Sequence, residues 1–161
     1  MLLMLAGPPG SGKSTYSKRL RDNPSFARDV LLSTDSYIES IAASTGRSYN
    51  ELFSSAIKDA TRFLDASLQA AVGSGLNLIW DQTNLEPGTR VKKLARVPHK
   101  YVKIAVYFEE DLDTLLLRNK ERAEYGRGLP EHVLISMISR WKRPSLDEGF
   151  AAISRGPRID D

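Results

Sequence analysis

The chain has 161 residues, of which 41% are hydrophobic and 27% charged, and 23 Lys and Arg against 20 Asp and Glu give a net charge of +3. This predicts one domain over residues 1–161, large enough for a real core, and no apolar run approaches the ~18 residues of a membrane span. The chain has no cysteine, which excludes disulfide and thiolate chemistry, and its two histidines are isolated, so no zinc site is expected. No secretory leader is expected, and a cytoplasmic protein is predicted.

Strand-like and helix-like segments alternate along the whole chain. Short apolar runs predict strands at residues 1–6, 29–33, 76–80 and 101–108, with one more short strand in the tail after residue 150. Apolar spacings of three and four predict helices at residues 13–21, 50–72, 112–122 and 131–142, with others after Pro87 and after Asp35. The alternation predicts an α/β fold, a three-layer sandwich around a mostly parallel central sheet.

The first strand runs directly into a glycine-rich loop, GPPGSGKS, that matches G-x-x-x-x-G-K-[ST] at every fixed position. Glycines let several backbone N–H groups point into one concavity that holds phosphate, helped by the following helix N-terminus. Lys13 would reach the β- and γ-phosphates, and Ser14 would offer its hydroxyl to Mg²⁺. A dinucleotide fingerprint is disfavoured because Thr15 stands where it needs glycine. The nucleotide-binding residues expected here are Gly7, Gly10, Ser11, Gly12, Lys13, Ser14 and Thr15.

Asp81 ends the apolar run LNLIWD and is the candidate second anchor for the metal. A carboxylate at the tip of a neighbouring buried strand is the usual partner of a phosphate-binding loop. The alternative is an aspartate that only caps a helix or turn. Thr83 and Asn84 follow closely and would lie near the transferred phosphate or its acceptor.

Asp35 follows the second strand, at the same sheet edge as the glycine-rich loop. A carboxylate there could accept the proton of an attacking hydroxyl. Its position fits a helix N-cap equally well, because Ser33, Thr34 and Asp35 all precede a helix. The residues alone leave these two interpretations open. Tyr37 could line the acceptor pocket or simply pack in the core.

The segment from Leu112 to Lys142 has the form of a helical lid, two helices joined by the glycine-containing connector AEYGRGLP. Arg118, Arg122 and Arg127 lie on or beside this connector, where closure could bring them to the nucleotide. Ion pairs with glutamates of the same helix explain the first two arginines as well. A GTPase is disfavoured, because no guanine-reading Asn-Lys-x-Asp occurs.

The motif order GPPGSGKSTY, STDSYIES, WDQTNL and the arginine-rich lid resembles the P-loop kinases of the polynucleotide 5′-hydroxyl kinase type, from Met1 to Trp141. The resemblance implies the P-loop NTPase kinase fold with a lid at about residues 112–142, and ATP with Mg²⁺ as cofactors. It implies Asp35 as general base, and nucleotide, phosphate or metal contacts from Lys13, Ser14, Arg122 and Arg127. It also implies metal or acceptor roles for Asp81, Thr83 and Asn84. Ile38 departs from the pattern, because phage-type members have an arginine there that contacts a 3′-phosphate.

Three functions follow from these residues. The first is a kinase of a nucleic-acid 5′-hydroxyl end, and the second is a kinase of a small molecule such as a nucleoside, modified nucleotide, sugar or antibiotic. The third is a non-catalytic, nucleotide-dependent binding module. Residues 90–103 carry six cations and no acid, which is typical of a solvated helix face and also fits a polyanion surface. Membrane binding is not expected, and the sequence leaves the oligomeric state open.

Overall fold

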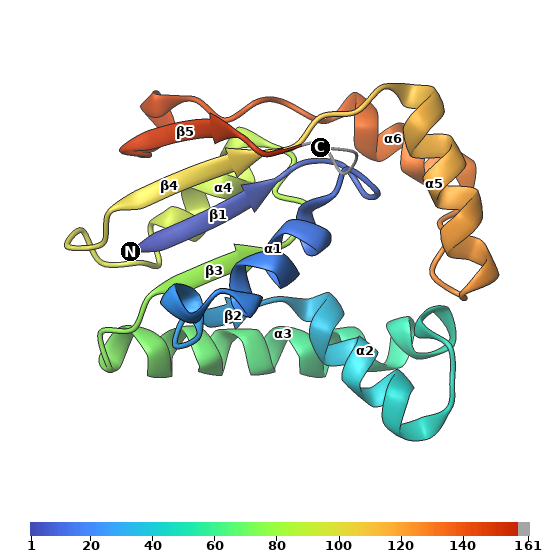
Figure 1. Cartoon of the computed structure of the whole chain (residues 1–161), viewed down its shortest axis with the longest axis horizontal. Coiled ribbons are helices and arrows are strands. Elements are labelled where there is room, and N and C mark those ends of the chain that lie inside the picture. Colours follow the sequence, from blue (N-terminus) through green and yellow to red (C-terminus); the bar gives the residue numbers. More distant parts are fainter. Residues whose placement is uncertain (158–161) are drawn as a thin grey trace.

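A computed structural model describes residues 1–157 and contains one five-stranded sheet in which every neighbouring pair is parallel. The strand order is β2-β3-β1-β4-β5, which runs from the bottom edge to the top edge in Figure 1. The strands are β1 (Leu2–Ala6), β2 (Val30–Leu32), β3 (Leu78–Asp81), β4 (Lys103–Tyr107) and β5 (Ala152–Arg155). Parallel pairing places the carboxyl ends of all five strands at one edge, where ligands bind in such sheets.

Six α-helices connect and cover the strands: α1 (Lys13–Asp22), α2 (Thr34–Thr45), α3 (Tyr49–Gly73), α4 (Pro87–Leu94), α5 (Leu112–Glu124) and α6 (Glu131–Ser139). Short 3₁₀ turns lie at Pro24–Phe26 and Leu146–Glu148. The helices α5 and α6 stand beyond the carboxyl ends of the strands, opposite the turn between α2 and α3 (Figure 1).

The two faces of β1 supply two separate parts of the core, because successive side chains of a strand point to opposite faces. Leu2 and Met4 pack with the side chains of α3 and of the segment around α4, among them Leu68 and Leu94. Leu3 and Leu5 pack on the other face, against Tyr16 of α1. The sheet is therefore the middle layer of three, as the sequence predicts. A third cluster joins α2 to α3.

The alternation and the expected strands and helices are confirmed, with shifted ends. The strand expected at 76–80 begins at Leu78 and includes Asp81, and the last expected helix ends at Ser139 rather than 142. The long helix begins at Tyr49, because Ser48 caps it and forms a reciprocal capping box with Glu51. Among the described residues, no helix is both long and apolar enough to cross a membrane.

The basic run at residues 90–103 is a solvated face only in part: Lys92, Arg96 and Lys100 are exposed, whereas the other cations of the run are buried or half-buried. Arg90 is completely buried and makes a two-pronged ion pair with Glu148, with both N–O distances 2.7 Å. Its guanidinium also donates to the carbonyls of Asn84, Leu85, Lys142 and Arg143. Arg96 pairs with Asp65 on α3. Much of this charge therefore holds α4 to the rest of the fold, so the run is no open polyanion surface.

Candidate active site

The glycine-rich loop wraps the carboxyl end of β1 and leads into α1. Gly12, the N-cap of α1, has a left-handed φ of 103°, which only glycine adopts without strain. Gly7 donates its N–H to the carbonyl of Thr83, and a Cβ on Gly7 would lie 2.5 Å from the carbonyl oxygen of Phe108. The loop is therefore packed between the ends of its two neighbouring strands. Ser14 and Thr15, at the start of α1, are exposed.

Lys13 lies inside the loop, only 6% exposed, with its ammonium donating to the carbonyl of Pro8 at 2.7 Å and to Ser11 Oγ at 3.4 Å. Burial lowers the pKa of Lys13 from 10.5 to about 8, and the positive charge of Arg122 adds to that effect. The carboxylates of Asp81 and Asp35 act in the opposite direction. These four groups, from a loop, a helix, a strand end and the lid, thus share one electrostatic environment.

Asp81 is the last residue of β3 and is 6% exposed. Its Oδ2 accepts a 2.7 Å hydrogen bond from Ser17, one helical turn after Lys13 on α1. Burial raises the pKa of Asp81, whereas the hydrogen bonds from Ser17 and Ser14 and the charge of Lys13 lower it. Asp81 caps no helix, so the capping alternative is wrong. Its proximity to the Ser14 hydroxyl gives two hard oxygen donors, the ligand type that Mg²⁺ prefers.

Asp35 is not the cap of α2. Ser33 is the N-cap, with its hydroxyl accepting from the N–H of Ser36 at 3.2 Å. The Asp35 carboxylate, half-buried in the first turn, instead accepts a 2.8 Å hydrogen bond from the phenol of Tyr49. The choice between cap and functional carboxylate therefore resolves against the cap.

The lid arginines differ in how they are held. Arg118 donates to the carbonyl of Gly10 at 3.0 Å and pairs with Glu110 at 3.5 Å, which ties α5 to the phosphate loop. Arg127 pairs with Glu39 of α2. Among the described residues, no hydrogen bond or ion pair engages the guanidinium of Arg122. Burial lowers the pKa of Arg122, and the charge of Arg127 adds to that effect, whereas the nearby carboxylates of Asp35 and Glu39 act in the opposite direction.

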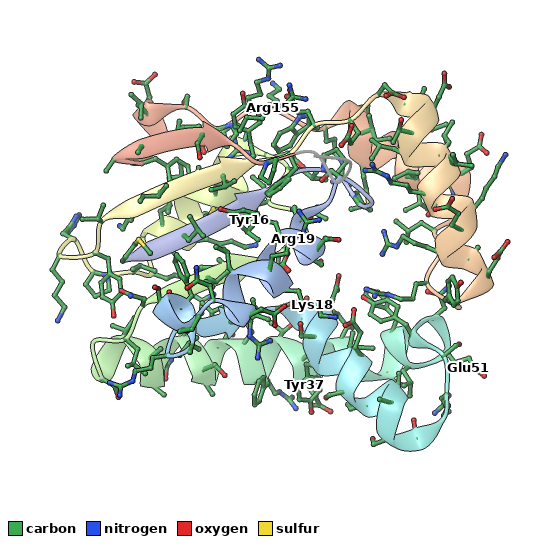
Figure 2. The ribbon with its side chains drawn as sticks, in the orientation of Figure 1. Tyr16, Lys18, Arg19, Tyr37, Glu51 and Arg155 are labelled. Carbon is green, nitrogen blue, oxygen red and sulfur yellow. The ribbon has the colours of Figure 1, made fainter. Side chains whose placement is uncertain are left out.

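The expected ion pairs of these arginines within the lid helix are not found among the described residues. Arg127 pairs with α2, and Arg118 pairs with the loop after β4. Side chains of α5 extend back toward α1 and the turn before α3 (Figure 2). The lid therefore stands over the same edge of the sheet as the phosphate loop.

The remaining expected acceptor residues lie in different places. Thr83 is half-buried beside the phosphate loop, at the rim of a hollow that reaches Met137 and Arg140 on and just after α6. Asn84 is buried, with a left-handed φ of 47°, and its amide donates to the carbonyl of Leu5 at 2.6 Å. The side-chain oxygen Oδ1 of Asn84 accepts from the ammonium of Lys93 at 2.6 Å. Asn84 thus fixes the loop after β3 to β1, and its side chain is already occupied.

Tyr37 packs against Phe63, with ring centroids 5.1 Å apart, and lies beside α3 away from the phosphate loop (Figure 2). The packing interpretation therefore describes its surroundings better than the acceptor-lining one. Ile38, where the phage-type pattern has arginine, is fully buried between α2 and α3. No group of three or more metal-ligating His, Cys, Asp or Glu occurs in residues 1–157.

Two residues of the site were missed from sequence. Ser17 carries only a helical signal, since it lies four residues after Lys13 and so on the same face of α1. Tyr49 lies between the capping residues Ser48 and Glu51, which mark a helix start in sequence. Nothing local indicates that its phenol meets Asp35, because that contact depends on how α2 and α3 pack.

The parallel sheet in this strand order, the phosphate loop and the helical lid define a nucleotide-binding protein of the P-loop kinase class. Comparison with known proteins agrees. The model of the family AAA_33, described as an AAA domain, matches residues 2–144, and the chain belongs to this family of P-loop kinases.

A curated relative, the L-seryl-tRNA(Sec) kinase of Methanococcus maripaludis, is 28% identical over 150 residues. The match covers 89% of this chain and 53% of that protein, so the chain spans about half the length of this relative. The name of this relative states a different acceptor, so the narrower resemblance to polynucleotide 5′-hydroxyl kinases stays a prediction.

Solved structures share the fold. A suspected kinase from Chloroflexus aurantiacus superposes with a TM-score of 0.70 at 21% identity, covering 99% of this chain and 89% of that one. Kti12 of Chaetomium thermophilum, in complex with ADP-AlF3, superposes with a TM-score of 0.68 at 18% identity, covering 100% of this chain and 91% of that one. Shikimate kinase of Aquifex aeolicus superposes with a TM-score of 0.54 at 18% identity, covering 98% of this chain and 88% of that one. At these identities the likeness concerns the fold alone.

Proposed function

We propose that this chain is an ATP-dependent kinase that transfers the γ-phosphoryl group to the hydroxyl of an acceptor, with Asp35 as general base. The observation that carries the proposal is that Lys13, Asp81, Asp35 and Arg122 lie close together around the phosphate loop. The charge of each of them shifts the pKa of at least one of the others. Asp35 is not the cap of α2, because Ser33 fills that position, and the charge of Asp35 raises the pKa of Arg122 in the lid.

In the proposed reaction the acceptor oxygen attacks the γ-phosphorus, the bond from phosphorus to the β–γ bridging oxygen breaks, and ADP leaves. The hydroxyl proton passes to the carboxylate of Asp35. Lys13 and Arg122 neutralise charge on the transferring group, and the loop amides orient the β-phosphate. Ser14 and Asp81 would hold Mg²⁺, which supplies further neutralisation of the phosphates when bound.

A small hydroxyl-bearing acceptor is the preferred substrate class, free or carried on a tRNA as the name of the curated relative states for that protein. Two observations favour it over a polynucleotide end. Arg90, within the basic run, is buried and used internally, and position 38 presents no cation to the site. The order of the motifs keeps a 5′-hydroxyl polynucleotide as the second candidate.

Asp35→Asn tests the chemistry. We expect turnover to fall about 10²–10⁴-fold, as for loss of a general base, while ATP affinity stays within about twofold. Asp22→Asn, an exposed aspartate at the end of α1, is the matched control. Undiminished turnover in Asp35→Asn would refute Asp35 as base, and a protein that binds ATP but shows no turnover at all would be the non-catalytic module.

The acceptor is tested by incubation with radiolabelled ATP and a panel of seryl-tRNA, deacylated tRNA, 5′-hydroxyl DNA and RNA oligonucleotides, shikimate and gluconate. Label on a small acceptor or on the seryl group supports the preferred class. Label on oligonucleotides alone, with activity that falls steeply with salt, assigns the polynucleotide candidate instead, because polyanion binding releases counter-ions.

A further inference from the structure

Tyr49 is the first residue of α3, and it lies inside the capping box that Ser48 and Glu51 form on either side of it. From this position its phenol donates to Asp35 Oδ1 at 2.8 Å. A carboxylate has two oxygens, so a hydrogen bond to Oδ1 leaves Oδ2 available to an acceptor. Because α3 is 25 residues long and packs along the sheet, Tyr49 is a rigid point of reference for the side chain of Asp35.

The same ring also contacts the lid. The guanidinium carbon of Arg127 lies 5.2 Å from the centroid of the Tyr49 ring, and Arg127 pairs with Glu39, four residues after Asp35 on α2. One side chain of α3 therefore touches both the candidate base and an arginine of the lid connector.

Asn50, the next residue, fastens the connector on both sides of Arg127. Its backbone N–H donates to the carbonyl of Gly126 at 3.0 Å, and its side-chain amide donates to the carbonyl of Gly128 at 3.0 Å. A Cβ on Gly126 would lie 2.6 Å from Cβ of Ser48, so the two segments are in close contact. The start of α3 is thus the surface on which the connector rests.

We propose that Tyr49 is a positioning residue, which orients the Asp35 carboxylate through its hydroxyl and couples that orientation to lid closure through its ring beneath Arg127. The inference rests on the proposed role of Asp35 as base. Burial raises the pKa of Tyr49 well above its ordinary value, and the neighbouring Asp35 charge adds to this, so the phenol keeps its proton and remains a donor.

A purely structural role, joining α2 to α3, would also explain the hydrogen bond, so the test must separate the two. The titratable and charged groups around the Asp35–Tyr49 pair are Glu39 on α2, Lys13 in the phosphate loop, Asp81 at the end of β3, and Arg122 and Arg127 in the lid. Because the charges of all these groups influence turnover, the informative quantity is the change in kcat between matched variants.

The experiment compares Tyr49→Phe, which removes only the hydroxyl, with Tyr49→Leu, which also removes the ring. Turnover is followed as ADP release from ATP across pH, with water and with each acceptor of the panel. For Tyr49→Phe we expect kcat to fall about tenfold, the size of one lost hydrogen bond to a charged group. We also expect KM for ATP to stay within about twofold, because the Tyr49 hydroxyl bonds Asp35 and its loss is felt in the transition state rather than in ATP binding.

Trypsin cleavage after Arg127 reports the lid without any acceptor. We expect the rate of cleavage to be unchanged in Tyr49→Phe and raised about two- to tenfold in Tyr49→Leu, which loses the ring under the guanidinium. Tyr125→Phe is the control, because this connector tyrosine is 78% exposed. Circular dichroism confirms that each variant is folded.

The outcomes distinguish this inference from the proposed function. Loss of turnover in Asp35→Asn, together with an unchanged kcat in Tyr49→Phe, would overturn the role of Tyr49 and leave the base in place. Undiminished turnover in Asp35→Asn would overturn both. Equal trypsin cleavage of Tyr49→Leu and the wild type would remove the coupling to the lid.

Discussion

Replacement of Lys13 by methionine should stabilise the protein while weakening its hold on ATP. The ammonium of Lys13 is buried, and this burial lowers its pKa from 10.5 to about 8. At about 1.4 kcal/mol for each pH unit, that difference corresponds to about 3 kcal/mol of destabilisation by the buried charge near neutral pH. Loss of the hydrogen bond to the carbonyl of Pro8 offsets about 1 kcal/mol. The expected net gain is about 2 kcal/mol, or about 4–8 °C in melting temperature.

The pH dependence gives this prediction its sign. Between pH 8 and 10.5 the unfolded chain keeps the lysine proton and the folded protein loses it, so wild-type stability rises with pH through that window. Below pH 8 the full penalty is present. The advantage of Lys13→Met should therefore shrink by about 2 kcal/mol between pH 7 and pH 10. Burial also lowers the pKa of Lys93 to about 8, but that residue titrates equally in both proteins and cancels in the difference.

The assay is urea unfolding at pH 7 and pH 10, with ATP affinity measured in parallel. Lys18→Met is the matched control, because Lys18 is an exposed lysine of the same helix (Figure 2) and should change stability by less than about 0.5 kcal/mol. ATP affinity of Lys13→Met should fall about 30-fold, the size of a lost charge-assisted contact. A variant less stable than the wild type at pH 7, or a difference in stability that does not change with pH, would refute the reasoning.

Two further predictions concern the scaffold. Arg90→Gln should destabilise the protein by about 3–5 kcal/mol in urea unfolding, because it leaves the buried partner Glu148 without its counter-ion; a melting temperature equal to that of the wild type would contradict this. Gly126→Ala and Gly75→Ala replace glycines of almost equal left-handed φ, +66° and +68°, but only at Gly126 does the new Cβ meet another residue, Ser48. Gly75→Ala should lower the free energy of unfolding by about 1 kcal/mol and leave turnover intact. Gly126→Ala should in addition displace the connector, speed trypsin cleavage there and slow turnover. Equal behaviour of the two variants would count against the connector contact.

Local sequence predicts most of the elements and the phosphate loop, because their signals are short-range. The spacing of apolar residues reports which side of a helix or strand is buried, and the loop requires glycines at fixed places beside Lys13. The same reasoning identifies Asp35 and Asp81 as carboxylates at the correct edge of the sheet.

These short-range signals do not predict which residues far apart in the sequence contact one another. Arg90 looks like one of six cations on a basic surface, and its burial depends on Glu148, 58 residues away. Asp35 looks like a cap until Ser33 is seen to fill that position. The phenol that reaches Asp35 comes from the next helix, whose placement depends on the cluster between α2 and α3.

The sequence by itself therefore determined that this chain folds as alternating strands and helices and binds a phosphate chain on the amides that precede α1. Only the tertiary structure decided that Asp35 is no helix cap, that Arg118 contacts the phosphate loop and that Arg90 is buried in an ion pair with Glu148. The physical reason is that backbone propensity, capping and periodicity act over a few residues. The charge and solvation of a side chain depend on groups that the parallel topology brings together from distant parts of the chain.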